Sequence, residues 1–445
     1  MTYNDTLDYL YTQLPMFTRM GASAFKKDLT NTIALCQKLD NPQHKFKSIH
    51  VGGTNGKGST SHMLAAVLQT AGYRTGLCTS PHLKDFRERI RIDGKMISEQ
   101  EVVDFVANHQ TDFEQIEPSF FEMTVALAFD AFARHQVDVA IIEVGLGGRL
   151  DSTNIITPLL SIITNISWDH MNLLGDTLPE IAGEKAGIIK PNIPVIIGEY
   201  QPETAQVFID KAAHENAPVS FASEQWNVEA QRQEKTDQRQ NEEISAKTSN
   251  SITILATSLP NSVPQTPLLL NLDLTGTYQL KNVKTVLSAV EELRRQHFDI
   301  SDEQVVDALS RVQLLTGLQG RWQTLSTSPL TICDTGHNPD GIEEVLKNIA
   351  SIPYQHLHFV IGMVNDKDIT KVLNLLPKDA TYYFCRPDIP RGLEAEAIQQ
   401  QAAAVGLFGQ IYPSVKQALQ AAQQKAGQQD LVFAGGSTFV VAEIV

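Results

Sequence analysis

The residues that decide the fold are His44–Ser59, which read HKFKSIHVGGTNGKGS. The apolar first half, His44–Val51, predicts a strand, and the Gly-rich second half predicts a turn. A helix is predicted from that turn through about Ala71, with Gly72 closing it. Glycines in such a turn let successive backbone N–H groups converge on phosphate oxygens, at the positive end of the following helix. Gly52–Ser59 is therefore predicted to bind phosphate.

Lys57 and its neighbours indicate that this phosphate belongs to a nucleotide. The Lys57 ammonium would contact the β- and γ-phosphates, and a following hydroxyl would support a metal ion. The common pattern places Ser or Thr directly after the lysine, whereas Gly58 here precedes Ser59. Thr54 and Asn55, placed with Lys57 after a clear strand, still favour nucleotide binding. The motif alone does not separate a kinase, an ATPase, a GTPase and a ligase.

Apolar runs alternate with segments of helical period on both sides of this motif. The helix expected after the motif is followed by another over Phe121–His135. Further strands are predicted over Arg74–Thr79, Val137–Val144, Leu159–Ile166 and Pro194–Gly198. Strands separated by helices predict an α/β fold, with a large, mainly parallel sheet of P-loop type flanked by helices.

A second alternation predicts a smaller, Rossmann-like α/β domain. Its strands are expected at Leu330–Cys333, His356–Ile361, Ala380–Cys385 and Leu431–Ala434, and its helices at Gly341–Ile349, Ile369–Leu376, Glu394–Val405 and Val415–Ala426. We therefore divide the chain into residues 1–296 and 297–445, with a ligand cleft between them. Between the two alternations, the polar stretch Asn227–Asn250 is predicted to be a solvated loop, and Ser251–Leu274 to form short strands with Pro-containing turns.

Composition limits the class of protein. The chain has 445 residues, which favours two domains, and a net charge of −15, which argues against nucleic acid or an anionic membrane as the main partner. A small anionic substrate remains possible where cations cluster locally. Met1–Leu10 lacks the basic start and apolar run of a signal peptide, and the four cysteines show no paired spacing. We expect a cytoplasmic protein with reduced, buried cysteines.

Polar residues follow two of the predicted strands. Glu143 lies at the end of Val137–Val144, and Asp169 and His170 follow Leu159–Ile166. Ligands of doubly wound sheets bind beyond the carboxyl ends of the strands. Glu143 and His170 are therefore candidate ligands for Mg²⁺ on nucleotide phosphates. By composition alone, Glu184 and Lys185 are simply exposed helix charges.

Taken together, these segments and several others resemble the folate branch of the Mur ligase superfamily. The matching motifs follow one another along nearly the whole chain. They are GTNGKGS at Gly53–Ser59, TSPHL at Thr79–Leu83, ERI at Glu88–Ile90, EVGLGGRLDSTN at Glu143–Asn154, DH at Asp169–His170, EKAGIIK at Glu184–Lys190, GRW at Gly320–Trp322, DTGHNP at Asp334–Pro339, GMVNDKD at Gly362–Asp368 and PRG at Pro390–Gly392. Each is short, whereas their order and spacing together are specific. The GGSTFVV run at Gly435–Val441 departs from the aromatic-rich segment of many relatives.

The resemblance implies a reaction. ATP phosphorylates a substrate carboxylate to an acyl phosphate, and the amino group of L-glutamate attacks it, forming an amide and releasing ADP and phosphate. The catalyst mainly positions the reactants and neutralises charge. Members of the family glutamylate both 7,8-dihydropteroate and reduced folates, or extend folates only. A third reading, a ligase acting on a cell-wall UDP-sugar, would require an additional N-terminal domain before the phosphate loop.

The resemblance also implies roles for particular residues. Asn55, Gly56, Lys57, Gly58 and Ser59 would hold the ATP phosphates, and Asn282, Arg321, Asp334 and His337 would reach ATP from the linker and the small domain. Ser80, Glu143, His170 and Lys185 would bind two Mg²⁺ ions, Lys185 after carbamylation, and Lys57, Glu143, His170 and Lys185 would be catalytic. Phe121, Gly148, Arg149 and Asp151 would line the pterin pocket, in the pattern of bifunctional members, and the protein is expected to be a monomer.

Overall fold

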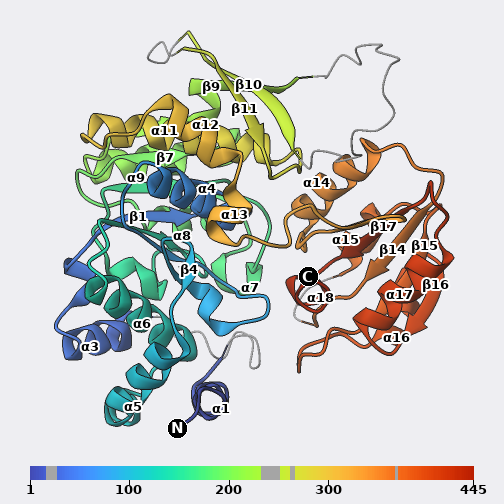
Figure 1. Cartoon of the computed structure of the whole chain (residues 1–445), viewed down its shortest axis with the longest axis horizontal. Helices are drawn as coiled ribbons and strands as arrows, with labels where there is room; N and C mark the ends of the chain where they lie inside the picture. Colours follow the sequence, from blue (N-terminus) through green and yellow to red (C-terminus); the bar gives the residue numbers. More distant parts are fainter. Residues whose placement is uncertain (17–27, 232–250, 261–265, 366–368) are drawn as a thin grey trace, which may run out of the picture.

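A computed structural model describes residues 1–16, 28–231, 251–260, 266–365 and 369–445. Two α/β bodies lie side by side, with the small C-terminal sheet on the right of Figure 1. Within the described residues, the larger sheet has eight strands in the order β4-β3-β2-β5-β1-β6-β7-β8. From β2 to β8 all neighbours are parallel, while β3 and β4 are antiparallel additions at one edge. The predicted α/β class with a mainly parallel large sheet is confirmed.

Five strands of the large sheet (β1, β2, β5, β6 and β7) lie close to the predicted positions, whereas β3, β4 and β8 were not predicted. The strands of the sheet are β1 (Lys47–Gly52), β2 (Thr75–Cys78), β3 (Ile90–Ile92), β4 (Lys95–Met96), β5 (Val139–Glu143), β6 (Leu160–Ile163), β7 (Val195–Ile197) and β8 (Val219–Phe221). Strand β1 starts later than predicted because Pro42–His44 form a 3-10 turn. The central strands are buried on both faces, which explains their continuous apolar runs.

Helices cover both faces of this sheet. They include α1 (Tyr3–Gln13), α3 (Thr30–Lys38), α4 (Lys57–Thr70), α5 (Glu99–Ile116), α6 (Phe120–Arg134), α7 (Met171–Leu174), α8 (Leu178–Ala186) and α9 (Pro202–His214). Helix α4 is almost entirely buried, since the sheet lies on one side and α11 (Gln279–Arg295) on the other. Helix α6 begins at a capping box, in which Ser119 accepts from the Glu122 N–H and Glu122 accepts from the Ser119 N–H.

A small antiparallel sheet packs on α11, at the top of Figure 1. It consists of β9 (Trp226–Ala230), β10 (Ile252–Ser258) and β11 (Leu268–Leu272). The prediction of a loop from residue 227 is wrong for its first residues, because Trp226 and Val228 are buried in β9. The rest of that polar stretch, residues 232–250, lies outside the described part of the chain. The prediction of strands within Ser251–Leu274 is confirmed by β10 and β11.

The packing of α12 (Asp302–Leu309) and α13 (Val312–Thr316) bears on the domain division. Both helices pack on α4, and α12 also contacts β11. Val305 and Leu309 lie in the same hydrophobic core as α4 because the apolar face of α12 is turned toward it. We therefore propose that the division lies near residue 318, after these helices, rather than at 296/297.

The C-terminal domain is a six-stranded sheet in the described chain, in the order β12-β13-β17-β14-β15-β16. The strands are β12 (Gln323–Thr327), β13 (Leu330–Cys333), β14 (Leu357–Ile361), β15 (Thr381–Cys385), β16 (Gly409–Tyr412) and β17 (Leu431–Gly435). Helices α14 (Pro339–Ala350), α15 (Thr370–Leu375), α16 (Ala395–Ala404), α17 (Val415–Lys425) and α18 (Thr438–Ala442) accompany them. All strand pairs except β12–β13 are parallel.

Two further observations concern the burial of the cysteines and the length and apolar character of the helices. Cys36, Cys78, Cys333 and Cys385 are all buried and free. Among the helices that the structure describes, none combines the length and apolar character needed to cross a membrane.

Candidate active site

A cavity of about 590 Å³ opens where the two sheets end. One wall comes from the phosphate loop and the ends of β2, β5 and β6, and the other from the residues that follow β13, β14 and β17. The residues predicted as site residues that line it are Lys57, Ser80, Phe121, Asp151, His170, Lys185 and His337. The cleft predicted between the domains is therefore present, at the carboxyl ends of parallel strands.

The phosphate loop has the tight backbone that its glycines allow. Gly56 has a φ of 84°, immediately before α4, and a Cβ atom there would lie 2.3 Å from Oδ1 of Asn282. Asn282, on α11, therefore packs directly against the loop. Ser59 is buried and accepts a hydrogen bond from Gln279. Gly58 contacts Arg321, which comes from the segment before β12.

Lys185 is buried, with 4% of its side chain exposed, so the composition-based view of an exposed helix charge is wrong. Helix α8 carries Lys185 under the phosphate loop, where Nζ donates to the carbonyl oxygen of Gly53 at 2.9 Å. Burial, together with the nearby Lys57 charge, lowers the pKa of Lys185 to about 7. A large fraction of this amine is therefore neutral, and nucleophilic, near neutral pH.

Glu143 ends β5 and is 5% exposed. Its Oε2 accepts the backbone N–H of Ser80 at 3.0 Å, which brings two of the predicted metal ligands together. Its Oε1 lies beside Gly58 and makes no hydrogen bond with any described residue. Burial raises the pKa of Glu143, and the charge of Lys57 opposes that rise. This carboxylate oxygen is available to a cation next to the phosphate loop.

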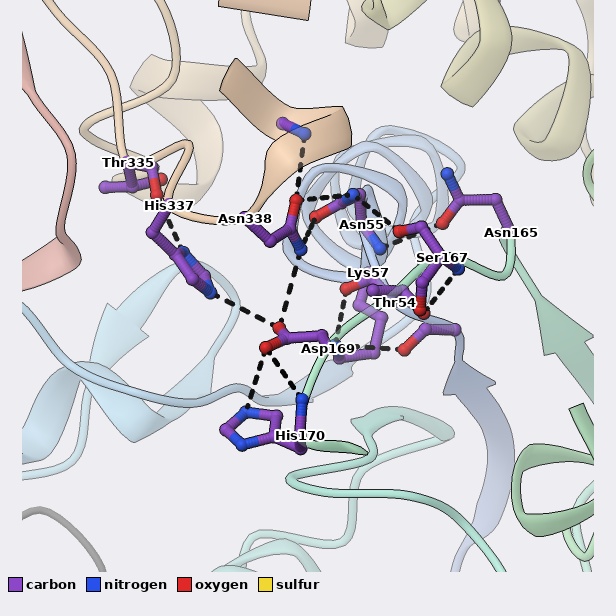
Figure 2. Close-up of polar contacts among 12 residues, drawn as sticks. Thr54, Asn55, Lys57, Asn165, Ser167, Asp169, His170, Thr335, His337 and Asn338 are labelled. Carbon is purple, nitrogen blue, oxygen red and sulfur yellow. Dashed lines mark hydrogen bonds and ion pairs between the residues drawn. The ribbon is translucent and has the colours of Figure 1, made fainter. Parts of the chain in front are cut away.

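The two domains meet in a network of hydrogen bonds centred on Asn338 (Figure 2). Asn338 caps α14 by accepting the N–H of Gly341. Its amide exchanges two hydrogen bonds with the amide of Asn55, at 3.0 and 3.2 Å, and also donates to Asp169 at 3.4 Å. His337 lies 3.5 Å from the same carboxylate, whose other oxygen lies 3.8 Å from His170. The predicted residues His170 and His337 are thus joined through Asp169.

Asp334 accepts hydrogen bonds from groups in and around its own loop. Its Oδ2 accepts from the Tyr278 hydroxyl and the Trp322 N–H, and its Oδ1 accepts from the Gly336 N–H. Burial raises the pKa of Asp334, and these hydrogen bonds oppose the rise. The carboxylate therefore ties the start of the small domain to the segment before α11.

Of the four residues predicted to line the pterin pocket, Phe121 and Asp151 line the cavity. Phe121 covers Gly145, where a Cβ atom would lie 2.4 Å from the ring, and both line the cavity. Asp151 is 2% exposed and accepts the N–H groups of Leu146 and Thr153, so it holds the Gly-rich loop as well as lining the cavity.

Gly148 and Arg149 lie beside the cavity rather than on its surface. Gly148 packs its backbone against α8, where a Cβ atom would lie 2.8 Å from the Glu184 carbonyl oxygen. The Arg149 guanidinium pairs with the Glu184 carboxylate at 2.8 Å and is half exposed. Neither residue is among those that line the cavity.

Sequence reasoning missed Arg89 and Asn338, which both line the cavity. Each lies within a matching motif, Arg89 in ERI and Asn338 in DTGHNP. Composition carries no further signal for either residue, because burial and interdomain contact depend on the folded chain. Residues 366–368 of the GMVNDKD motif lie outside the described part of the chain.

A phosphate loop on a parallel sheet, facing a second α/β domain across a shared cavity, defines a two-domain nucleotide-binding enzyme. The chain belongs to the Mur ligase family. The Mur ligase middle domain matches residues 51–290, and the Mur ligase glutamate ligase domain matches residues 320–438.

Within this family the chain is similar to folate enzymes. It is 31% identical to a dihydrofolate synthase/folylpolyglutamate synthase of Bacillus subtilis, over 99% of this chain and 98% of the relative. Its structure matches E. coli FolC in complex with DHPP and ADP, with a TM-score of 0.83, 29% identity, and coverage of 100% and 97%. It also matches a bifunctional folylpolyglutamate synthase/dihydrofolate synthase with Mn, AMPPNP and L-glutamate bound, with a TM-score of 0.81, 29% identity, and coverage of 100% and 97%.

Proposed function

We propose that this protein is an ATP-dependent ligase that adds L-glutamate to the carboxylate of dihydropteroate and of reduced folates, through an acyl phosphate. The observation that carries the proposal is the cavity shared by the two domains. It places the phosphate loop, the buried Lys185 and the aromatic Phe121 on one continuous surface. The full-length likeness to bifunctional folate enzymes supports the choice of substrates.

The chemistry follows from what these residues can supply. A carboxylate is a poor electrophile because it is anionic and its oxygen leaves poorly, and phosphorylation removes both obstacles. The N–H groups of the phosphate loop and the Lys57 ammonium neutralise charge on the transferring phosphoryl group. Glutamate then attacks the acyl carbon, the amide C–N bond forms, and phosphate leaves. The two domains hold the reactants together, which raises their effective concentration.

The residues present fit a divalent cation completed by substrate phosphates. No group of three or more His, Cys, Asp or Glu side chains in the described chain forms a metal site by itself. Mg²⁺ commonly binds through one or two carboxylates together with nucleotide phosphates and water, so a complete protein cage is not required. The unpartnered Oε1 of Glu143, beside the loop and Ser80, suits this arrangement. A bound cation would neutralise phosphate charge, with His170 as a further ligand, and carbamylated Lys185 would hold a second cation.

Carbamylation of Lys185 is supported by its burial and by the lowering of its pKa to about 7. The neutral amine attacks CO₂, a C–N bond forms, and a proton is released to solvent. The product is an anion in place of a cation, and it lies beside the phosphate loop. Lys185 then contributes a metal ligand where Coulomb repulsion from Lys57 would otherwise disfavour a second cation.

An ADP-release assay with ATP, Mg²⁺ and L-glutamate tests the proposal, with dihydropteroate and tetrahydrofolate supplied separately. We expect glutamate-dependent release of ADP with both acceptors. Release with tetrahydrofolate alone would restrict the protein to folylpolyglutamate synthesis. Release with neither acceptor would refute the proposed function, and omission of glutamate controls for ATP hydrolysis alone.

A further inference from the structure

Arg89 is a buried cation on the wall of the cavity. It is the last residue of the 3-10 turn Phe86–Arg89, directly before β3, and only 5% of it is exposed. It lines the cavity together with Phe120 and Phe121.

No acidic side chain of the described residues forms an ion pair with Arg89, and the charges of Glu143 and Glu88 act on it only from a greater distance. Its Nε donates to Nδ1 of His82 at 2.7 Å, and its guanidinium lies 5.4 Å from the centre of the Phe120 ring. Burial lowers the pKa of His82 to about 3, so His82 is a neutral acceptor that orients the guanidinium without compensating its charge. Among the described residues, Arg89 forms no salt bridge, and its two terminal nitrogens form no hydrogen bond.

The two arginines on either side differ from Arg89. Arg87 pairs with Asp85 at 2.7 Å, and Arg91 donates to the carbonyl oxygen of Gly94 at 3.1 Å. Neither lines the cavity. Arg89 is therefore the member of this run that lines the cavity and whose terminal nitrogens have no acceptor among the described residues.

A buried charge without a counter-ion is costly, so this arrangement suits an anion that arrives with the substrate. Burial lowers the pKa of Arg89 to about 10, which still leaves the guanidinium charged at neutral pH. The terminal nitrogens of an arginine match a carboxylate with two parallel hydrogen bonds. The oriented, unpaired fork thus predicts a carboxylate ligand.

We propose that Arg89 binds the α-carboxylate of the terminal glutamate of a folate acceptor, the carboxylate that does not react. This inference rests on the proposed function. A bidentate guanidinium occupies the lone pairs of a carboxylate, whereas the reacting carboxylate must direct one oxygen to phosphorus. The α- and γ-carboxylates of glutamate are separated by three carbon atoms, so one cavity holds both.

The consequence is a difference between the two acceptors. Dihydropteroate has a single carboxylate, and that carboxylate reacts. A folate ending in glutamate has a second one, which Arg89 engages. Arg89 therefore favours chain extension over the first glutamylation and acts as a specificity-determining residue.

The first test compares two acceptors with the wild-type protein. One is tetrahydrofolate, and the other is its analogue with 4-aminobutyrate in place of glutamate, which lacks only the α-carboxylate. We expect kcat/KM to be about 100-fold lower for the analogue, the usual effect of removing one partner of a buried charged pair. Equal values would overturn the role of Arg89 while leaving the proposed function intact. Turnover of neither acceptor would remove the proposed function, and this inference with it.

The second test uses variants. Arg89→Gln removes the charge and retains a donor for His82, and Arg87→Gln is the matched control at a paired arginine outside the cavity. We expect Arg89→Gln to abolish the preference for tetrahydrofolate over the analogue and to lower kcat/KM for tetrahydrofolate much more than kcat/KM for dihydropteroate. Equal losses with dihydropteroate and tetrahydrofolate would overturn the proposal. Arg89→Lys keeps a cation, and we expect it to restore part of the preference.

Discussion

Lys57 and Lys185 donate to the same backbone carbonyl oxygen, that of Gly53, at 3.1 and 2.9 Å. Two ammonium groups are thus held together under the phosphate loop. Their repulsion adds to the effect of burial and lowers the pKa of Lys185 to about 7. This pairing explains why Lys185, rather than an exposed lysine, suits carbamylation.

Replacing Lys185 tests whether the site requires a negative charge, from a carbamate, or a positive charge at this position. We expect Lys185→Ala and Lys185→Arg to lose turnover to a similar degree, about 1,000-fold or more, because neither side chain forms a carbamate. Steady-state ADP release measures this loss. Near-normal activity of Lys185→Arg would show that the site needs positive charge at this position.

The lowered pKa of Lys185 predicts the direction in which pH changes both bicarbonate activation and stability. Carbamylation needs the neutral amine, so we expect activation by added bicarbonate to weaken as the pH falls through about 7. The folded state also binds fewer protons than the unfolded state between the lowered pKa of about 7 and the ordinary lysine pKa of 10.5. The contribution of Lys185 to stability therefore increases as the pH rises across this window. Thermal unfolding of wild type and Lys185→Ala from about pH 7 to about pH 10 measures it, and parallel curves would contradict it.

Asn338 links the small domain to the phosphate loop through Asn55. Asn338→Ser keeps an N-cap for α14 but removes the amide pair and adds no charge. We expect turnover to fall about tenfold, corresponding to one or two hydrogen bonds, with little change in thermal stability. Asn338→Ala should lose the cap as well, at a cost of about 1 kcal/mol. Wild-type turnover of Asn338→Ser would show that the amide pair is dispensable.

Position 56 requires glycine because of its backbone conformation and because Asn282 lies close to it. Its φ is 84°, and a Cβ atom would lie 2.3 Å from Oδ1 of Asn282. We expect Gly56→Ala to be destabilised by about 1–3 kcal/mol and to bind nucleotide poorly. Gly183 within α8 has open space around its Cβ position, so Gly183→Ala should be neutral or stabilising. Calorimetric unfolding and ATP titration compare the two, and equal effects would contradict this account.

Arg149 and Asp151 are neighbours with different surroundings. The Arg149–Glu184 pair is partly exposed, so Arg149→Ala should change stability by less than about 1 kcal/mol. The buried Asp151 carboxylate holds the N–H groups of Leu146 and Thr153, so Asp151→Ala should cost about 1–3 kcal/mol and raise KM for dihydropteroate. Chemical denaturation and initial rates measure both, and a larger loss for Arg149→Ala would reverse this ranking.

Local pattern predicted most elements of this fold. Strand β13 has the bounds expected from its apolar run, and α4 begins at Lys57 because the glycines before it allow the turn. The prediction was less accurate at the ends of elements and at β9. There, the alternating polar residues in Asn227–Ala230 were assigned to a loop, although they belong to a strand. Tertiary packing gives this strand a buried face, which a polar composition does not reveal.

The sequence by itself determined the alternation of strands and helices, the phosphate loop and the family, since these depend on residue types at short spacing. Only the tertiary structure decided that Lys185 is buried, that Arg149 pairs with Glu184, that Arg89 lines the cavity with no ion pair to another described residue, and that Asn338 contacts a residue 283 positions away. Burial and long-range hydrogen bonds arise from the packing of distant segments. The periodicity of residue types along the chain therefore does not predict them.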